Sequence, residues 1–101
     1  MHLVELFLPL APGDGAPTAR EKMEGVVTDL ADRFGGATAF TREPAEGLWK
    51  DAGEVERDDI VIVEVMVEEL DERWWRGYRA RLEREFAQER ILVRATRCQI
   101  I

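Results

Sequence analysis

The sequence predicts an α+β domain in which a four-stranded antiparallel sheet carries two helices on one face. Three observations support this prediction. Segments with the two-residue alternation of strands and segments with helical spacing of apolar residues follow one another as β-α-β-β-α-β. Residues 59–67 have an unbroken row of valines on one side. The length of 101 residues matches one domain, residues 1–101.

The first strand is expected at residues 2–8, where the residues alternate between two sides. One side would hold Val4, Leu6 and Leu8, and the other Leu3, Glu5 and Phe7. Residues 9–17 are rich in proline and glycine, so we expect a loop there.

A helix is expected after this loop, because Thr18 and Glu21 have the spacing of a capping box. Apolar residues then recur at helical intervals and form one stripe. They are Met23, Val26, Val27, Leu30, Ala31 and Phe34. The pair Gly35-Gly36 predicts the end of the helix.

The second and third strands are expected to form a hairpin. Residues 37–42 read as a strand, residues 43–47 interrupt it, and residues 48–50 resume it. A turn at residues 51–53 leads back through Val55 into the third strand.

The third strand has two different sides. One is entirely apolar and consists of Val61, Val63, Val65 and Val67. The other consists of Ile60, Ile62, Glu64 and Met66. A carboxylate in the middle of an apolar side needs a partner, a binding role or solvent, because burying it alone is costly. Glu64 is therefore the strongest candidate for a functional residue.

Asp71 is a good N-cap for a second helix. The residues expected on its buried side are Trp75, Tyr78, Leu82 and Phe86. The pairs expected to support its exposed side at i,i+4 spacing are Glu72–Arg76, Arg79–Glu83 and Arg81–Glu85. Residues 90–101 are expected to form the last strand.

Two interleaved right-handed βαβ crossovers give the ferredoxin-like sandwich, with strands usually in the order 4-1-3-2. The helices would cover the side of the sheet that holds the valine row, together with Ile91, Val93 and Ala95. The uncovered side would hold Leu92, Arg94, Thr96 and Cys98 from the last strand. This order places Arg94, Glu5 and Glu64 on adjacent strands, as a charge row across a largely apolar surface. Such a surface usually marks an interaction site.

Composition excludes several functions. A formal charge of −7 argues against nucleic acid and against an anionic membrane as partners. Cys98 is the single cysteine, so no disulfide is expected. Residues 3–10 are too short for a signal peptide or a membrane span, and the cytoplasm is the expected compartment. No EF-hand spacing, histidine cluster or nucleotide motif is present, so neither a metal nor an organic cofactor is expected.

The charges are unevenly distributed along the chain. Residues 43–72 hold twelve Asp or Glu and two basic residues, whereas residues 73–97 hold eight Arg and three Glu. One interpretation is a set of solvated loops and helix faces. The other is a pair of complementary patches that guide self-association or capture a charged ligand.

In topology and size the chain resembles small bacterial ferredoxin-like proteins that pair face to face as dimeric α+β barrels. The segment 46–50 (Glu-Gly-Leu-Trp-Lys), with residues 57–59 after it, looks like the signature of an uncharacterised group. The barrel group includes small monooxygenases, isomerases and stress-responsive domains. The resemblance implies a homodimer.

Two functions from different classes remain open. The first is a self-associating ligand-binding or regulatory module that uses the uncovered sheet face, with Glu5 and Glu64 paired to Arg94 or to an arginine of a partner subunit. The second is a cofactor-free enzyme of the monooxygenase or isomerase type, with Glu64 as general base. A small apolar or aromatic ligand would then contact Phe7, Trp49, Ile62 and Met66.

Overall fold

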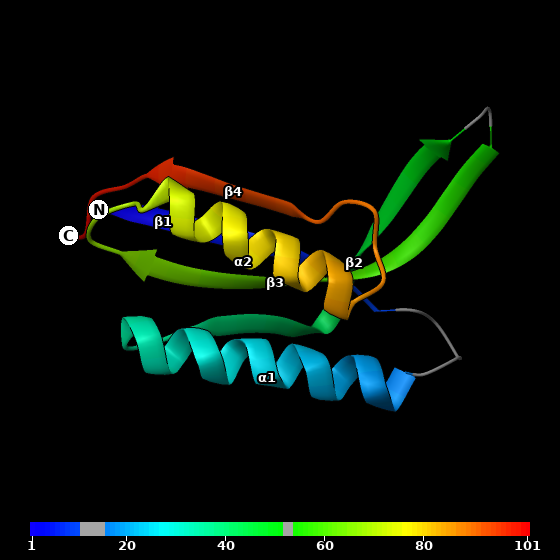
Figure 1. Ribbon diagram of the computed structural model, residues 1–101, viewed down its shortest axis with the longest axis horizontal. Coiled ribbons are helices and arrows are strands. Elements are labelled where there is room, and N and C mark those ends of the chain that lie inside the picture. The colour runs from blue at the N-terminus through cyan, green and yellow to red at the C-terminus, as the bar shows by residue number, and fades with distance from the viewer. Residues whose placement is uncertain (11–15, 52–53) are drawn as a thin grey trace.

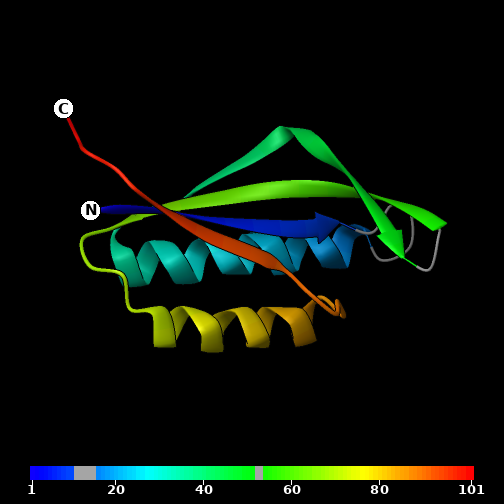
Figure 2. The ribbon, with the colours of Figure 1, turned by 90° about the horizontal axis from the view of Figure 1, so that it is seen from above.

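In the computed structural model, residues 1–10, 16–51 and 54–101 are described, with the backbone alone for residues 10, 16–19, 40–51 and 54–59. The elements are β1 (His2–Leu10), α1 (Ala16–Phe34), β2 (Thr38–Asp51), β3 (Glu54–Val67), α2 (Glu72–Glu85) and β4 (Leu92–Arg97). The strands form one antiparallel sheet in the order β2-β3-β1-β4. Both helices lie on the same face of it (Figures 1 and 2). The predicted α+β ferredoxin-like sandwich and its strand order are confirmed.

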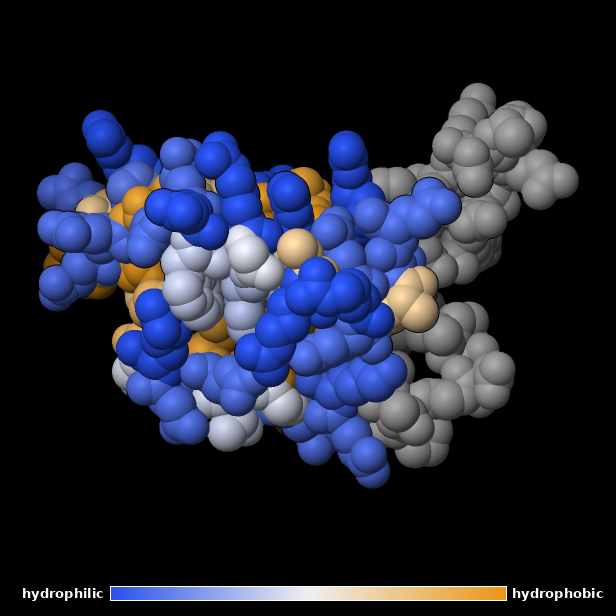
Figure 3. All heavy atoms as spheres, in the orientation of Figure 1, coloured by the Kyte–Doolittle hydropathy of each residue, from blue (hydrophilic) through white to orange (hydrophobic). Residues whose placement is uncertain are grey.

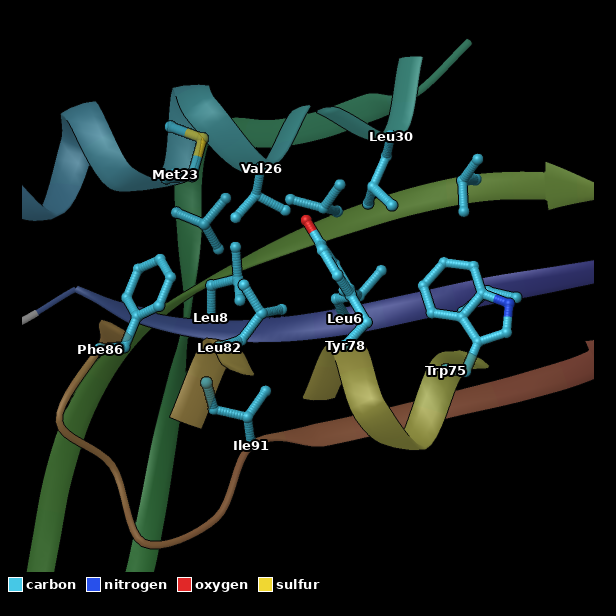
Figure 4. Close-up of a cluster of buried hydrophobic side chains, with 14 of the residues drawn as sticks. Leu6, Leu8, Met23, Val26, Leu30, Trp75, Tyr78, Leu82, Phe86 and Ile91 are labelled. Carbon is cyan, nitrogen blue, oxygen red and sulfur yellow. The ribbon is translucent and has the colours of Figure 1, made fainter. Parts of the chain in front are cut away.

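The hydrophobic core lies between the sheet and the helices (Figure 4). From the sheet side it contains Val4, Leu6, Leu8, Ile91 and, from β3, Val61, Val63, Val65 and Val67, and from the helix side Met23, Val26, Leu30, Trp75, Tyr78, Leu82 and Phe86. Each is at most 8% exposed. Burial of one such side chain contributes about 1.5–3 kcal/mol. The covered face of the sheet is thus the one that the valine row predicts.

β1 is longer than predicted. The prediction of a loop at residues 9–17 was wrong at its start. Pro9 and Leu10 continue the strand, opposite Ile60 and Asp59 of β3. Pairing of β1 with β4 ends at Phe7 and Leu92. Beyond that point one side of β1 has no strand beside it among the described residues, so a proline without an N–H group is tolerated there. Residues 11–15 of the expected loop lie outside the described part.

α1 begins at Ala16, earlier than the cap expected at Thr18. Pro17 falls in its first turn, where the missing N–H group costs no helical hydrogen bond. The helix ends at Phe34, and Gly35 follows with a φ of 88°. This left-handed conformation favours glycine, which explains the predicted stop.

β2 is one strand of 14 residues rather than two short ones. The expected interruption is present as a shift of register between Phe40 and Ala45. Figure 2 shows β2 arching away from the other strands there, on the side opposite the helices. In the described part of the chain, residues 47–51 of β2 and 54–58 of β3 pair only with each other, because β1 ends opposite Asp59. We call these two segments the arm; it projects beyond the sheet in Figure 1.

α2 and β4 follow the predicted order with different lengths. The Asp71 carboxylate accepts a hydrogen bond from the N–H group of Trp74 at 3.1 Å, so the predicted N-cap is confirmed. The buried residues of α2 are Trp75, Tyr78 and Leu82, as expected, and Phe86, also expected on this side, is buried as the C-cap that follows the helix. β4 ends at Arg97 rather than at Ile101, because its partner strand begins at His2, opposite Arg97.

Candidate functional site

The sheet face opposite the helices is the candidate site, and we call it the open face. It consists of Leu3, Glu5 and Phe7 of β1, Ile60, Ile62, Glu64 and Met66 of β3, Leu92, Arg94 and Thr96 of β4, and Cys98. Met66 and Leu92 are 36% and 44% exposed. Ile60 is buried, which differs from its expected exposure; it lies opposite Ala45, where the arch of β2 returns to the sheet. By contrast, the helix side of the molecule is mostly hydrophilic (Figure 3).

The charge row lies in register across three strands. Glu5 stands opposite Glu64 on one side and opposite Arg94 on the other. The Nε atom of Arg94 donates a hydrogen bond to Oε1 of Glu5 at 2.9 Å. The side chain of Glu5 is 14% exposed and that of Arg94 56%. Glu5 is therefore neutralised locally, and Arg94 covers it from the solvent side.

Arg94 also lies over Phe7. Its guanidinium carbon is 4.9 Å from the centre of the Phe7 ring, a distance typical of cation–π contacts. The arginine thus holds one carboxylate and one ring on neighbouring positions of the same side of β1. This arrangement orders the centre of the open face.

Glu64 lies in a different environment. It borders a hollow of about 480 Å³ at the end of the sheet where β2 begins, since Thr38 is opposite Glu64. The other lining residues are Leu3, Phe34, Gly35, Gly36, Ala37, Thr38, Val65 and Met66. Among the described side chains, which exclude those of residues 40–51 in β2, none forms a hydrogen bond or ion pair with the Glu64 carboxylate. A half-buried carboxylate with apolar neighbours favours a cation.

The segment from Phe34 to Thr38 was not expected at the site. Its glycines were interpreted only as a helix stop. A Cβ atom placed on Gly36 would meet nothing within 4 Å, so the wall of the hollow is open there. Two glycines, which lack side chains, between a helix and an edge strand are the feature of the sequence that leaves this wall open.

Trp49 is not brought to the other candidate residues within one chain. Its backbone lies in the arm, opposite Glu56. From Glu56 to Glu64 is eight residues of β3, or roughly 26 Å at ~3.3 Å per residue. Of the candidates, Glu5, Phe7 and Arg94 are in contact, Met66 and Glu64 share the hollow, and Ile62 stands opposite Phe7.

Metal-binding clusters and membrane-spanning helices are two further kinds of functional feature. Within the described residues, no group of three or more His, Cys, Asp or Glu is placed to hold a metal ion. Neither described helix has the length and apolar composition needed to cross a membrane.

Comparisons with known proteins show a likeness of fold. No family model matches the sequence, and no curated protein matches it. Among solved structures, a phage SAM lyase in the apo state superposes with a TM-score of 0.60, over 94% of this chain and 78% of that chain. The two sequences are 18% identical, so the likeness shows a shared fold.

Proposed function

We propose that the protein is a self-associating ligand-binding or regulatory module, and that two copies meet through the open face. The observation that carries this proposal is the apolar surface around the Glu5–Arg94 pair. Met66 and Leu92 are exposed on it, and Leu3, Phe7 and Ile62 are half-buried. Contiguous apolar surface of this kind on a domain favours association with another molecule.

The ion pair fits an interface better than an isolated surface. Glu5 already has its counter-charge, so covering it with a second copy leaves no unpaired carboxylate buried at that position. Arg94 keeps free N–H donors for groups of the partner, since a guanidinium has five. A charged pair in an apolar contact also selects one register of association. A small apolar or aromatic ligand would lie between the two faces, near Phe7 and Met66.

Light scattering coupled to size exclusion tests this proposal. The open-face contact by itself is expected to give twice the 11.6 kDa chain mass. Leu92→Glu places a charge on the open face and is expected to abolish the open-face dimer with an unchanged circular dichroism spectrum. Gln99→Glu adds the same charge at an exposed position after β4 and serves as the control. A wild-type monomer at all concentrations, or a Leu92→Glu dimer, would contradict the proposal.

A second function, an enzyme with Glu64 as general base, is supported by the hollow. The carboxylate there has no counter-charge among the described side chains, so a small organic cation is the ligand class that the site favours. The similar solved structure is that of a SAM lyase, and S-adenosylmethionine is a sulfonium cation. A lyase reaction breaks a C–S bond of such a cation, the electron pair leaves on sulfur, and a base takes the proton lost from carbon.

Incubation with S-adenosylmethionine and chromatography of the products tests the second function. Turnover is expected to disappear in Glu64→Gln, which keeps the shape of the side chain but removes its charge. Glu5→Gln is the matched control, because Glu5 stands opposite Glu64 on the next strand and is already paired. Absence of turnover by the wild-type protein, or equal loss in both variants, would count against Glu64 as a base for this substrate.

A further inference from the structure

A second hollow lies between α2 and β4, on the helix side of the sheet. Its volume is about 160 Å³. Its apolar lining consists of Val4, Leu70, Trp75, Val93 and Ala95, and its charged lining of Glu72, Arg76 and Arg79. Arg94 also borders the hollow, although its guanidinium group lies on the open face. Arg76 and Arg79 are exposed and lie one helical turn apart on α2. We call this surface, together with the outer edge of β4, the α2–β4 groove.

The outer edge of the groove is an unpaired strand. β4 is the last strand of the sheet, and in the described part of the chain only β1 pairs with it. Its six residues therefore present a row of backbone N–H and C=O groups to the outside. An extended segment of another chain can pair with such an edge and place its side chains in the adjacent hollow.

The arm is the part of this chain that fits the groove. It is a two-stranded ribbon whose strands pair, within the described ranges, only with each other, and an isolated ribbon of this kind is marginally stable in water. It projects from the sheet on the side of the molecule away from the chain termini (Figure 1). Residues 54–58 of β3 offer an outer edge of five residues, comparable with the six residues of β4.

The distribution of charge favours the arm, rather than β4 of a second copy, as the strand that pairs with β4. Residues 46–59 contain six Asp or Glu and two Lys or Arg, whereas residues 73–97 contain eight Arg and three Glu. Pairing β4 with β4 of a second copy would bring Arg94 and Arg97 of both copies into one pair of strands, and like charges on neighbouring strands are destabilising. Pairing β4 with the arm sets basic residues against acidic ones.

We propose that the arm of one copy docks in the α2–β4 groove of a second copy, with residues 54–58 beside β4. The contact is heterologous, because one surface receives and a different surface inserts, so it builds a ring or extends a chain of copies. Trp49, opposite Glu56 in the arm, supplies a residue type that is enriched at interface centres. This contact shares β4 with the open face, but its groove on α2 and its inserting arm lie outside the open face, so it is a proposal distinct from the function proposed above.

Paired charge reversals test the docking. Arg76→Glu with Arg79→Glu alters the groove, and Glu54→Lys with Glu56→Lys alters the arm. Each variant alone is expected to raise the dissociation constant measured by sedimentation at low salt by about tenfold or more. Mixing the two variants is expected to restore assembly, because each arm then meets a groove of opposite charge. Restoration also shows that both variants are folded.

The control reverses two arginines of α2 that do not line the groove, Arg73→Glu with Arg84→Glu, and is expected to assemble like the wild type. Wild-type assembly by the groove variant, failure of the mixture, or equal loss in the control would overturn the docking. If Leu92→Glu disrupts association while the groove variant does not, the docking alone is wrong. If the groove variant disrupts it and Leu92→Glu does not, the open-face proposal alone is wrong.

Discussion

The two sides of β3 differ in residue type and in exposure to solvent, although they share one backbone. On the helix side, Val61, Val63, Val65 and Val67 are at most 3% exposed. On the open side, Ile62 and Glu64 are half-buried and Met66 is 36% exposed. Because side chains alternate along a strand, one segment can stabilise the domain and carry an interaction surface without conflict. The open face is therefore free to hold charges and a hollow that the core would not tolerate.

The largest effect on stability is expected in β1, where a substitution on the covered side of the sheet can be compared with one on the open side. Leu6→Ala removes a side chain that is 0% exposed and is expected to lower the free energy of unfolding by about 3 kcal/mol. Leu3→Ala, on the open side of β1, is expected to cost about 1 kcal/mol. Urea denaturation at a protein concentration below that of association measures both. Equal losses would mean that the two sides contribute equally to stability.

In the helix layer, the buried side chain of Tyr78 is expected to make stability depend on pH. Burial, with a smaller contribution from Asp29, raises the pKa of Tyr78 from 10.0 to about 12. The unfolded chain then ionises first, so this stability is present below pH 10.0 and lost as the pH rises to about 12. The loss is on the order of 2 kcal/mol.

Tyr78→Phe is the matched variant for this alkaline loss. The hydroxyl group points toward α1 in Figure 4 and has no partner among the described residues. Its removal is expected to leave stability at neutral pH unchanged or higher, and to flatten the alkaline decline. Urea titrations at a series of alkaline pH values measure the difference between the two proteins. Identical declines would show that other groups cause it.

The cap of α2 gives a smaller effect on the covered side. Asp71→Ala removes the acceptor for the Trp74 N–H group and is expected to cost about 1 kcal/mol. Asp71→Asn keeps a side-chain oxygen and is expected to restore most of the loss. Thermal unfolding by circular dichroism compares the three proteins. A large loss in both variants would indicate that the charge, not the hydrogen bond, is what matters.

The smallest effect on stability is expected at the centre of the open face. Arg94→Ala breaks the 2.9 Å pair with Glu5, but the arginine is 56% exposed and screened by solvent, so the cost is about 0.5 kcal/mol. Association is expected to weaken more than folding does. Arg97→Ala, also exposed on β4, is the control for loss of charge. A drop in stability as large as that of Leu6→Ala would place Arg94 in the core of the fold.

The predicted positions of residues on the sheet are confirmed where strand order and alternation decide them, whereas positions that depend on strand length were not predicted. The position of Glu5 between Glu64 and Arg94 follows from the strand order and from alternation, both readable from residue types. The hollow beside Glu64 depends on where β2 starts relative to β3, at Thr38 opposite Glu64. The separation of Trp49 from Glu64 depends on how far the hairpin extends beyond β1. Neither the starting residue of β2 nor the length of the hairpin can be predicted from a local sequence pattern.

The sequence by itself determined the order of the elements, the covered side of the sheet and the cap of α2. These depend on periodicity and on residues within one turn or strand, so the information is local. Only the tertiary structure decided that Pro9 stays in β1, that β2 arches at residues 40–45 and that β4 stops at Arg97. Each of these boundaries is set by where a neighbouring strand begins or ends, because a backbone hydrogen bond needs both partners in place.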